Sequence, residues 1–124
     1  MDEKRIYKPL EEYSNDQIKE IFKRNNFEEL ARLPLSLGMI HTNWKFAQDI
    51  CVMLSMNESA LIRANAVLGF AYIARTNGKL EKHIIKPIVL KELRENHEYN
   101  WRIIDAIDDI NLFMKWRISK VQKY

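Results

Sequence analysis

Two segments of this chain repeat each other at a constant offset of 39 residues. The matching positions are Leu54 with Leu93, Asn57 with Asn96, Ile62 with Trp101, and Arg63 with Arg102. Self-similarity at about 40 residues is typical of proteins built from stacked pairs of helices. Because the sequence holds only 3 Gly and shows no strand-like alternation, it predicts an all-α fold, a short α-solenoid of about three helical hairpins.

Apolar periodicity predicts six helices within this arrangement. Ser14 followed by Gln17 is the signature of a capping box at the first helix start, and Gly78 is suited to the left-handed residue after the fourth helix. The fourth helix is apolar almost all round, so we expect it at the centre of the fold. The expected helices are 14–25, Phe27 to Pro34 or Gly38, Thr42 or Asn43 to Leu54, 59–76, Leu80 to Leu93, and 98–118.

A chain of 124 residues fits one domain, so we expect a single helical domain over 1–124. Residues 1–13 contain Pro9 and mixed charges without periodicity, which indicates an N-terminal arm. Residues 119–124 end the chain with a polar, basic segment that we expect to fray.

Composition argues against several classes of function. A single cysteine, Cys51, permits neither an internal disulfide nor a thiolate zinc cluster, and His41, His83 and His97 belong to no recognisable ligand set, so no metal is expected. No segment approaches the ~20 consecutive apolar residues of a membrane helix, so we expect a cytoplasmic protein with no membrane contact. Phosphate-binding loops, nucleophile elbows and paired-histidine zinc motifs do not occur, so the sequence predicts no enzyme and no cofactor.

Charge is unevenly distributed along the chain. Residues 1–60 carry 8 Lys and Arg against 10 Asp and Glu, whereas residues 61–124 carry 12 against 7. The basic second half leaves nucleic acid open as a partner, but its positive residues are not gathered into a run.

Residues 44–76 and 81–118 resemble HEAT-type repeats. In each, a first helix leads through an Asn-containing turn to an apolar residue followed by Arg, Ile62-Arg63 in one copy and Trp101-Arg102 in the other. In addition, the apolar run 61–75 and the segment 103–110 resemble small bacterial helical-repeat proteins that act as immunity proteins beside polymorphic or contact-dependent growth-inhibition toxins. That resemblance implies a protein partner, a cognate toxin domain.

Three carboxylates form the sharpest cluster of candidate functional residues. Asp105, Asp108 and Asp109 follow an i, i+3, i+4 spacing, and Trp101 lies one turn earlier on the same side. A partner with a basic cleft, such as a nuclease, would neutralise these carboxylates, with Trp101 as an aromatic anchor. The alternative is a solvated helix face offset by Arg102, Lys115 or a neighbouring lysine. A third interpretation, in which the carboxylates catalyse a reaction on a base, is weakened by the shortness of the chain.

Polar residues on the apolar fourth helix form a second group. Asn65, Tyr72 and Arg75 would either line a groove for a partner or satisfy buried backbone groups. Trp44, at a helix start, is either an exposed contact residue or part of the packing at the end of the stack. For Arg63 and Arg102, the repeat favours a structural role, bonding to Asn57 and Asn96 or to carbonyl groups of the turns.

Together these features predict a non-enzymatic protein-binding module, an immunity protein that neutralises a toxin domain. The competing hypotheses are a nucleic-acid-binding or base-processing HEAT-like protein and a general scaffold or adaptor.

Overall fold

The computed structural model describes residues 13–121, and within that range the chain forms six α-helices and no strand. The all-α prediction and the three hairpins are confirmed. The arm predicted for residues 1–13 lies outside the described residues except for Tyr13, which packs against the core. The helices are α1 (Asn15–Arg24), α2 (Phe27–Ile40), α3 (Trp44–Leu54), α4 (Ala60–Asn77), α5 (Lys82–Glu95) and α6 (Asn100–Met114).

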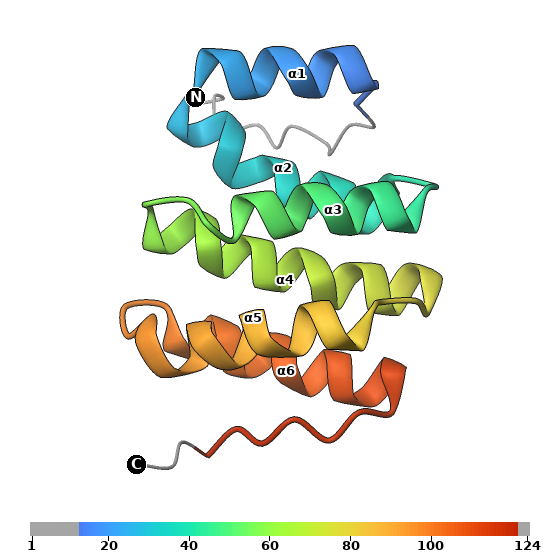
Figure 1. Cartoon of the computed structure of the whole chain (residues 1–124), viewed down its shortest axis with the longest axis vertical. Helices are drawn as coiled ribbons and strands as arrows, with labels where there is room; N and C mark the ends of the chain where they lie inside the picture. Colours follow the sequence, from blue (N-terminus) through green and yellow to red (C-terminus); the bar gives the residue numbers. More distant parts are fainter. Residues whose placement is uncertain (1–12, 122–124) are drawn as a thin grey trace, which may run out of the picture.

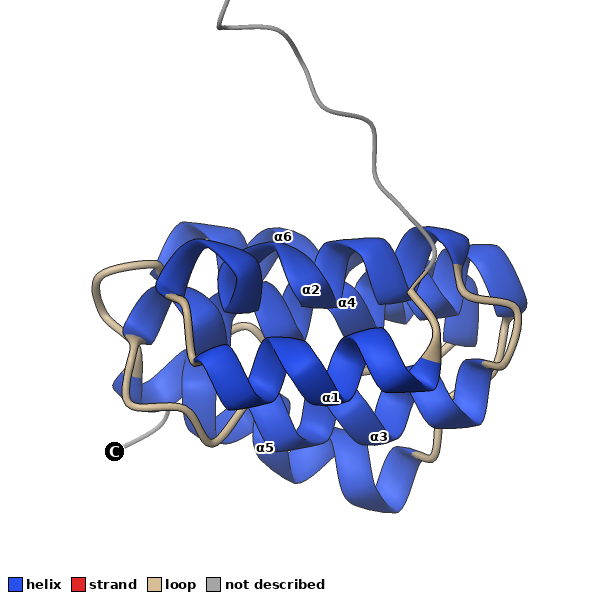
Figure 2. Ribbon diagram, turned by 90° about the horizontal axis from the view of Figure 1, so that it is seen from above, coloured by secondary structure: helices blue, strands red, loops and turns tan. Residues whose placement is uncertain are grey.

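The helices form two layers. In Figure 1 they follow one another from α1 at the top to α6 at the bottom, and Figure 2 shows α2, α4 and α6 along one side with α1, α3 and α5 along the other. Helix α4 contacts α2, α3, α5 and α6, which confirms its predicted central position. Because four helices cover α4, only a narrow strip of its surface is left for solvent.

Local sequence signals set most helix ends. Ser14 and Gln17 form the predicted capping box, and the side chains of Asn26, Asn43 and Ser59 each accept a hydrogen bond from the first turn of the helix that follows. Gly78 adopts the left-handed conformation, with φ of 67°, at the end of α4, as expected.

The predicted end of α2 is wrong. The helix continues through Pro34 and past Gly38 to Ile40, so neither residue stops it. Gly38 instead lets α2 approach α4 closely: a Cβ atom at Gly38 would lie 2.6 Å from the Tyr72 Cβ and 2.7 Å from the Gly69 carbonyl oxygen. Since real Cβ atoms almost never come so near, this crossing requires glycine.

The predicted length of α6 is also wrong, because the helix ends at Met114 rather than at 118. Lys115 takes a left-handed conformation, with φ of 59°, and the chain continues as an extended strap, residues 115–121. The side chain of Asn111 holds this strap by accepting from the Ile118 amide and donating to the Ile118 carbonyl, both at 3.0 Å. Burial of Ile118 is worth about 1.5–3 kcal/mol, which offsets the ~1–2 kcal/mol cost of a left-handed residue.

Within residues 13–121, none of the helices has the length and apolar content needed to cross a membrane.

Replacement of Gly38 tests whether the close approach of α2 and α4 limits stability. Gly38→Ala gains about 1 kcal/mol of helix propensity, but its Cβ would clash with the Tyr72 Cβ and with a backbone oxygen, neither of which can move easily, so the clash should cost about 3 kcal/mol. We therefore expect a net loss of about 2 kcal/mol in the free energy of unfolding in urea. Gly78→Asn is the control, because its surroundings are open and Asn25 already takes the left-handed conformation at the end of α1. Equal stability of Gly38→Ala and wild type would contradict the conclusion that the crossing of α2 and α4 requires glycine at position 38.

Candidate functional site

The outer strip of α4 and the neighbouring strip of α6 form one continuous surface, here called the α4/α6 face. Helical spacing places Leu68, Tyr72 and Arg75 on the strip of α4, and Trp101, Asp105, Asp108 and Leu112 on that of α6. Arg75 is exposed, Tyr72 is half-buried, and Trp101 keeps 59% of its surface in solvent. The structure therefore brings most of the residues predicted to bind a partner onto one surface.

Two of the three aspartates on α6 are paired within the chain. The Lys120 ammonium lies 2.6 Å from the Asp108 carboxylate, and the Arg75 guanidinium lies 3.6 Å from that of Asp109. Asp105 is exposed and has no ion pair with any residue in 13–121. Of the cations expected to offset the cluster, a neighbouring lysine does so, namely Lys120, whereas Arg102 and Lys115 do not, and Arg75 was not expected. The uncompensated charge of the cluster is consequently small.

Arg75 has a fixed place between two neighbours. Its guanidinium lies 5.5 Å from the centre of the Tyr72 ring, one turn earlier on α4, and it reaches Asp109 across the seam between α4 and α6. A cation over an aromatic ring is attracted by the ring electrons. This arrangement holds the guanidinium on the surface with half of the side chain still exposed.

Asn65 and Trp44 lie away from this surface. Asn65 is 5% exposed, and its amide donates to the Ala31 carbonyl of α2 at 2.9 Å while its carbonyl accepts from Arg102 of α6. Asn65 was expected either to line a groove or to satisfy buried backbone groups, and the structure shows the second role. Trp44 begins α3 in the other layer, where it packs partly buried against the core.

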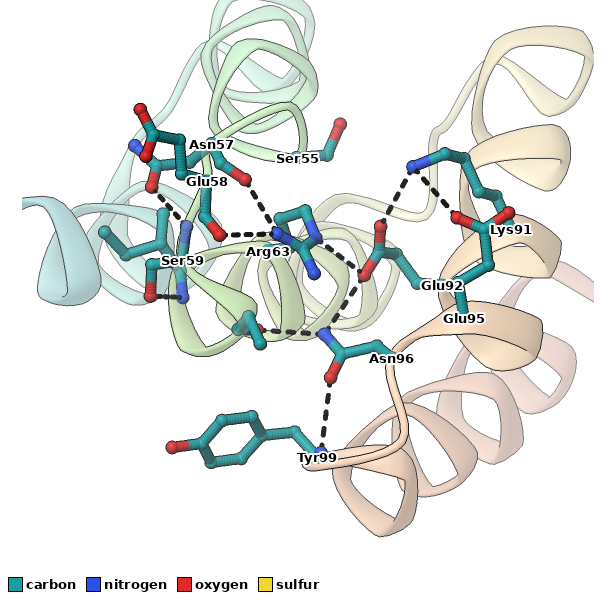
Figure 3. A network of polar contacts seen from close by, with 12 residues as sticks. Ser55, Asn57, Glu58, Ser59, Arg63, Lys91, Glu92, Glu95, Asn96 and Tyr99 are labelled. Atoms are coloured by element: carbon teal, nitrogen blue, oxygen red, sulfur yellow. Dashed lines mark hydrogen bonds and ion pairs between the residues drawn. The ribbon is translucent and has the colours of Figure 1, made fainter.

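The repeated arginines differ in what they contact. Arg63 donates to the Asn57 and Glu58 carbonyls, both at 2.9 Å, so its predicted bond to the turn is confirmed (Figure 3). Arg102 is different, because it reaches back to Asn65 on α4 and does not bond to Asn96. Its guanidinium also lies 5.2 Å from the Trp101 ring centre, which steadies that exposed ring.

Sequence reasoning missed the buried carboxylate of Glu92. Figure 3 shows it between Arg63, whose Nε donates to it at 3.2 Å, and Asn96, whose amide donates at 3.0 Å. A signal for it did exist: Ile85, Val89 and Glu92 follow the i, i+4, i+7 spacing of a buried stripe. Arg63 and Glu92 join the turn before α4 to α5, so this network is structural.

A second polar link joins α3 to the start of α5. The Glu81 carboxylate accepts from the Lys45 ammonium at 2.8 Å and from the buried Gln48 amide at 2.7 Å. The hydrogen bond from Lys45 lowers the pKa of Glu81 most, and the hydrogen bond from Gln48 lowers it further, because both stabilise the ionised carboxylate. The link fixes the layer opposite the α4/α6 face.

A groove of about 910 Å³ lies between α1 and α3, and its largely apolar lining includes Phe22, Phe46, Ile50 and Met53. Across residues 13–121 no three His, Cys, Asp or Glu side chains are grouped so as to hold a metal ion. Cys51 is fully buried, and burial raises the pKa of its thiol.

Comparison with solved structures gives an informative similarity. Neither a protein-family model nor a curated protein sequence matches the chain. Among solved structures, the chain is similar to one in the crystal structure of a CDI complex from Cupriavidus taiwanensis LMG 19424, with a TM-score of 0.72. The match covers 87% of this chain and 96% of that chain at 21% sequence identity, so it establishes a shared fold.

Removal of the buried carboxylate tests the structural role of the Glu92 network. Glu92→Ala removes the only carboxylate that Arg63 contacts among residues 13–121 and the acceptor of the Asn96 amide, and we expect the free energy of unfolding to fall by about 2–4 kcal/mol. Glu95→Ala is the matched control, since Glu95 lies one turn further along α5, is half exposed, and pairs only with surface cations, so its removal should cost less than about 1 kcal/mol. Urea unfolding of both variants measures the difference. Similar losses of unfolding free energy in the two variants would refute the structural role of the Glu92 network.

Proposed function

We propose that this chain is a non-enzymatic protein-binding module, an immunity protein that neutralises a toxin domain by covering its active surface. The observation that carries this proposal is the fold shared with a chain of a CDI complex over most of both lengths. It is joined by the independent sequence resemblance to immunity proteins of contact-dependent growth-inhibition systems. The cytoplasmic location expected from the sequence belongs to the same proposal.

The α4/α6 face is the surface that we assign to the toxin. It presents Trp101, Tyr72 and Arg75, and these three residue types are the ones most enriched among binding hot spots. The helices beneath the face are rigid, because α4 and α6 are buried on their inner sides by the core. A preorganised surface loses little conformational entropy on binding, which favours a tight complex.

Growth measurements test the proposal directly. The proposal requires a cognate toxin, expected in the neighbouring gene, and its toxic domain is expressed from an inducible promoter, with and without the chain. We expect the toxin domain alone to stop growth and co-expression to restore it, with the two proteins purifying as a complex. If the chain itself stops growth, or gives no protection, the proposal is wrong.

The nucleic-acid hypothesis has a separate test. Arg63, Arg75 and Lys120, all in the basic half, are paired with carboxylates of the chain, which reduces the charge available to phosphates. Binding through phosphates would weaken steeply as salt rises. An electrophoretic shift of DNA or RNA at low salt would support this hypothesis, and its absence would remove it.

Truncation of the exposed tryptophan tests the assigned face. We expect Trp101→Ala to raise the dissociation constant of the toxin complex by about 30-fold or more, equal to about 2 kcal/mol. The free energy of unfolding should change by less than about 0.5 kcal/mol, because the ring is largely in solvent. Met53→Ala is the control, an equally exposed apolar residue on α3 in the other layer. Titration calorimetry measures both, and a larger loss for Met53→Ala would place the interface elsewhere.

A further inference from the structure

The α4/α6 face carries both signs of charge, although the sequence indicated an acidic cluster. Lys120 neutralises Asp108, and Arg75 neutralises Asp109, which leaves Asp105 as the one of these three aspartates that has no ion pair with any residue in 13–121. Arg75 has five N–H donors, and its contacts with Tyr72 and Asp109 do not use all of them. The face therefore offers a partner the carboxylate of Asp105 and the guanidinium of Arg75.

Along the axis of α6, Asp105 and the Arg75–Asp109 pair are about one helical turn apart. Asp105 and Asp109 are separated by four residues on α6, which corresponds to a rise of about 6 Å, and Arg75 lies beside Asp109. A complementary surface would carry a basic group and a carboxylate at the same separation, as a helix with Lys and Glu four residues apart does.

Exposed apolar side chains lie on the two helices that flank the Arg75 strip of α4. Met39 of α2 follows Gly38, which contacts Tyr72 of α4 and whose carbonyl accepts from Thr76 at 3.0 Å. Leu112 and Phe113 follow Asp109 at i+3 and i+4, and Met39, Leu112 and Phe113 are 44%, 67% and 40% exposed. When a partner covers these residues, water is excluded from Arg75, and a charged hydrogen bond made there becomes stronger.

We propose that the α4/α6 face selects a partner surface that places a carboxylate on Arg75 and a basic group on Asp105, with apolar side chains over Met39 on one side and over Leu112 and Phe113 on the other. The inference rests on the proposed function, since the partner is the toxin domain, and it adds the charge pattern that the toxin domain must present. Arg binds carboxylate through two parallel hydrogen bonds, so the contact is specific in geometry as well as in charge. A uniformly basic cleft would be repelled by Arg75, and this repulsion discriminates against the wrong partner.

Arg75→Met distinguishes this partner from a uniformly basic one by the direction of the effect. If a carboxylate binds Arg75, the variant should bind the toxin domain at least about tenfold more weakly, mainly through faster dissociation. If the partner is uniformly basic, the variant should bind more tightly, because it frees Asp109 and removes a repulsive charge. Lys79→Met makes the same change in net charge just beyond the end of α4 and should leave the affinity within about twofold of wild type.

Asp105→Asn tests the second contact. We expect slower association and a weaker salt dependence of the association rate, because Asp105 attracts the basic group before contact. Unchanged association kinetics would overturn this part of the proposal.

Peptides provide a test that does not need the toxin domain. An alanine-rich helical peptide with Leu, and with Glu and Lys four residues apart, is compared with its all-Lys counterpart by NMR titration. We expect the mixed peptide to bind more tightly and to shift the Arg75 Nε–H signal, and Arg75→Met to abolish the difference. Equal or tighter binding of the all-Lys peptide overturns the inference. If the wild-type chain fails to bind the toxin domain, the proposed function is wrong, and the peptides alone decide the inference.

Discussion

The close approach of α2 and α4 at Gly38 and Gly69 is the contact on which the rest of the fold depends. Without side chains at these positions, the two helices lie near enough for Asn65 to donate to the Ala31 carbonyl on α2. The same amide accepts from Arg102, so α6 takes its position from the α2–α4 pair. One close crossing and one buried amide thus place three helices in register. The orientation of Trp101 and Asp105 on α6 is a consequence of that register.

Burial of α4 decides where a partner can be recognised. Four helices cover it, and the strip that remains carries few polar side chains, chiefly Tyr72 and Arg75. Arg75 is held there by the Tyr72 ring and by Asp109, so a residue of the buried central helix becomes a rigid surface contact. Recognition by such a strip does not need long loops. It needs only that the neighbouring helices add further contact groups on either side. Here α2 adds Met39, and α6 adds Trp101 and Asp105.

Much of the architecture could be predicted from the sequence, because it depends on local signals. The repeat, the capping box at Ser14 and the left-handed Gly78 are all readable within a few residues. The errors concern contacts between distant segments. Gly38 resembled a helix end until its crossing with α4 was seen, and α6 resembled a longer helix because the hold of Asn111 on Ile118 has no local signature. The pairing of Asp108 with Lys120 was hidden for the same reason. At Glu92 the local signal existed, since its spacing from Ile85 and Val89 already placed a carboxylate on a buried stripe.

The strap after α6 has a consequence for how the array could be extended. It lies along the side of α6 away from α4, below the last hairpin in Figure 1, and Ile118 covers apolar surface there. Another hairpin stacked on α6 would need that same surface. Extension by design would therefore begin with removal of the two Asn111 hydrogen bonds and of Ile118, and would release Lys120 from Asp108 as well. Because Lys120 belongs to the strap, adding a hairpin there would leave Asp108 unpaired. Lengthening the array would therefore also make the α4/α6 face more acidic.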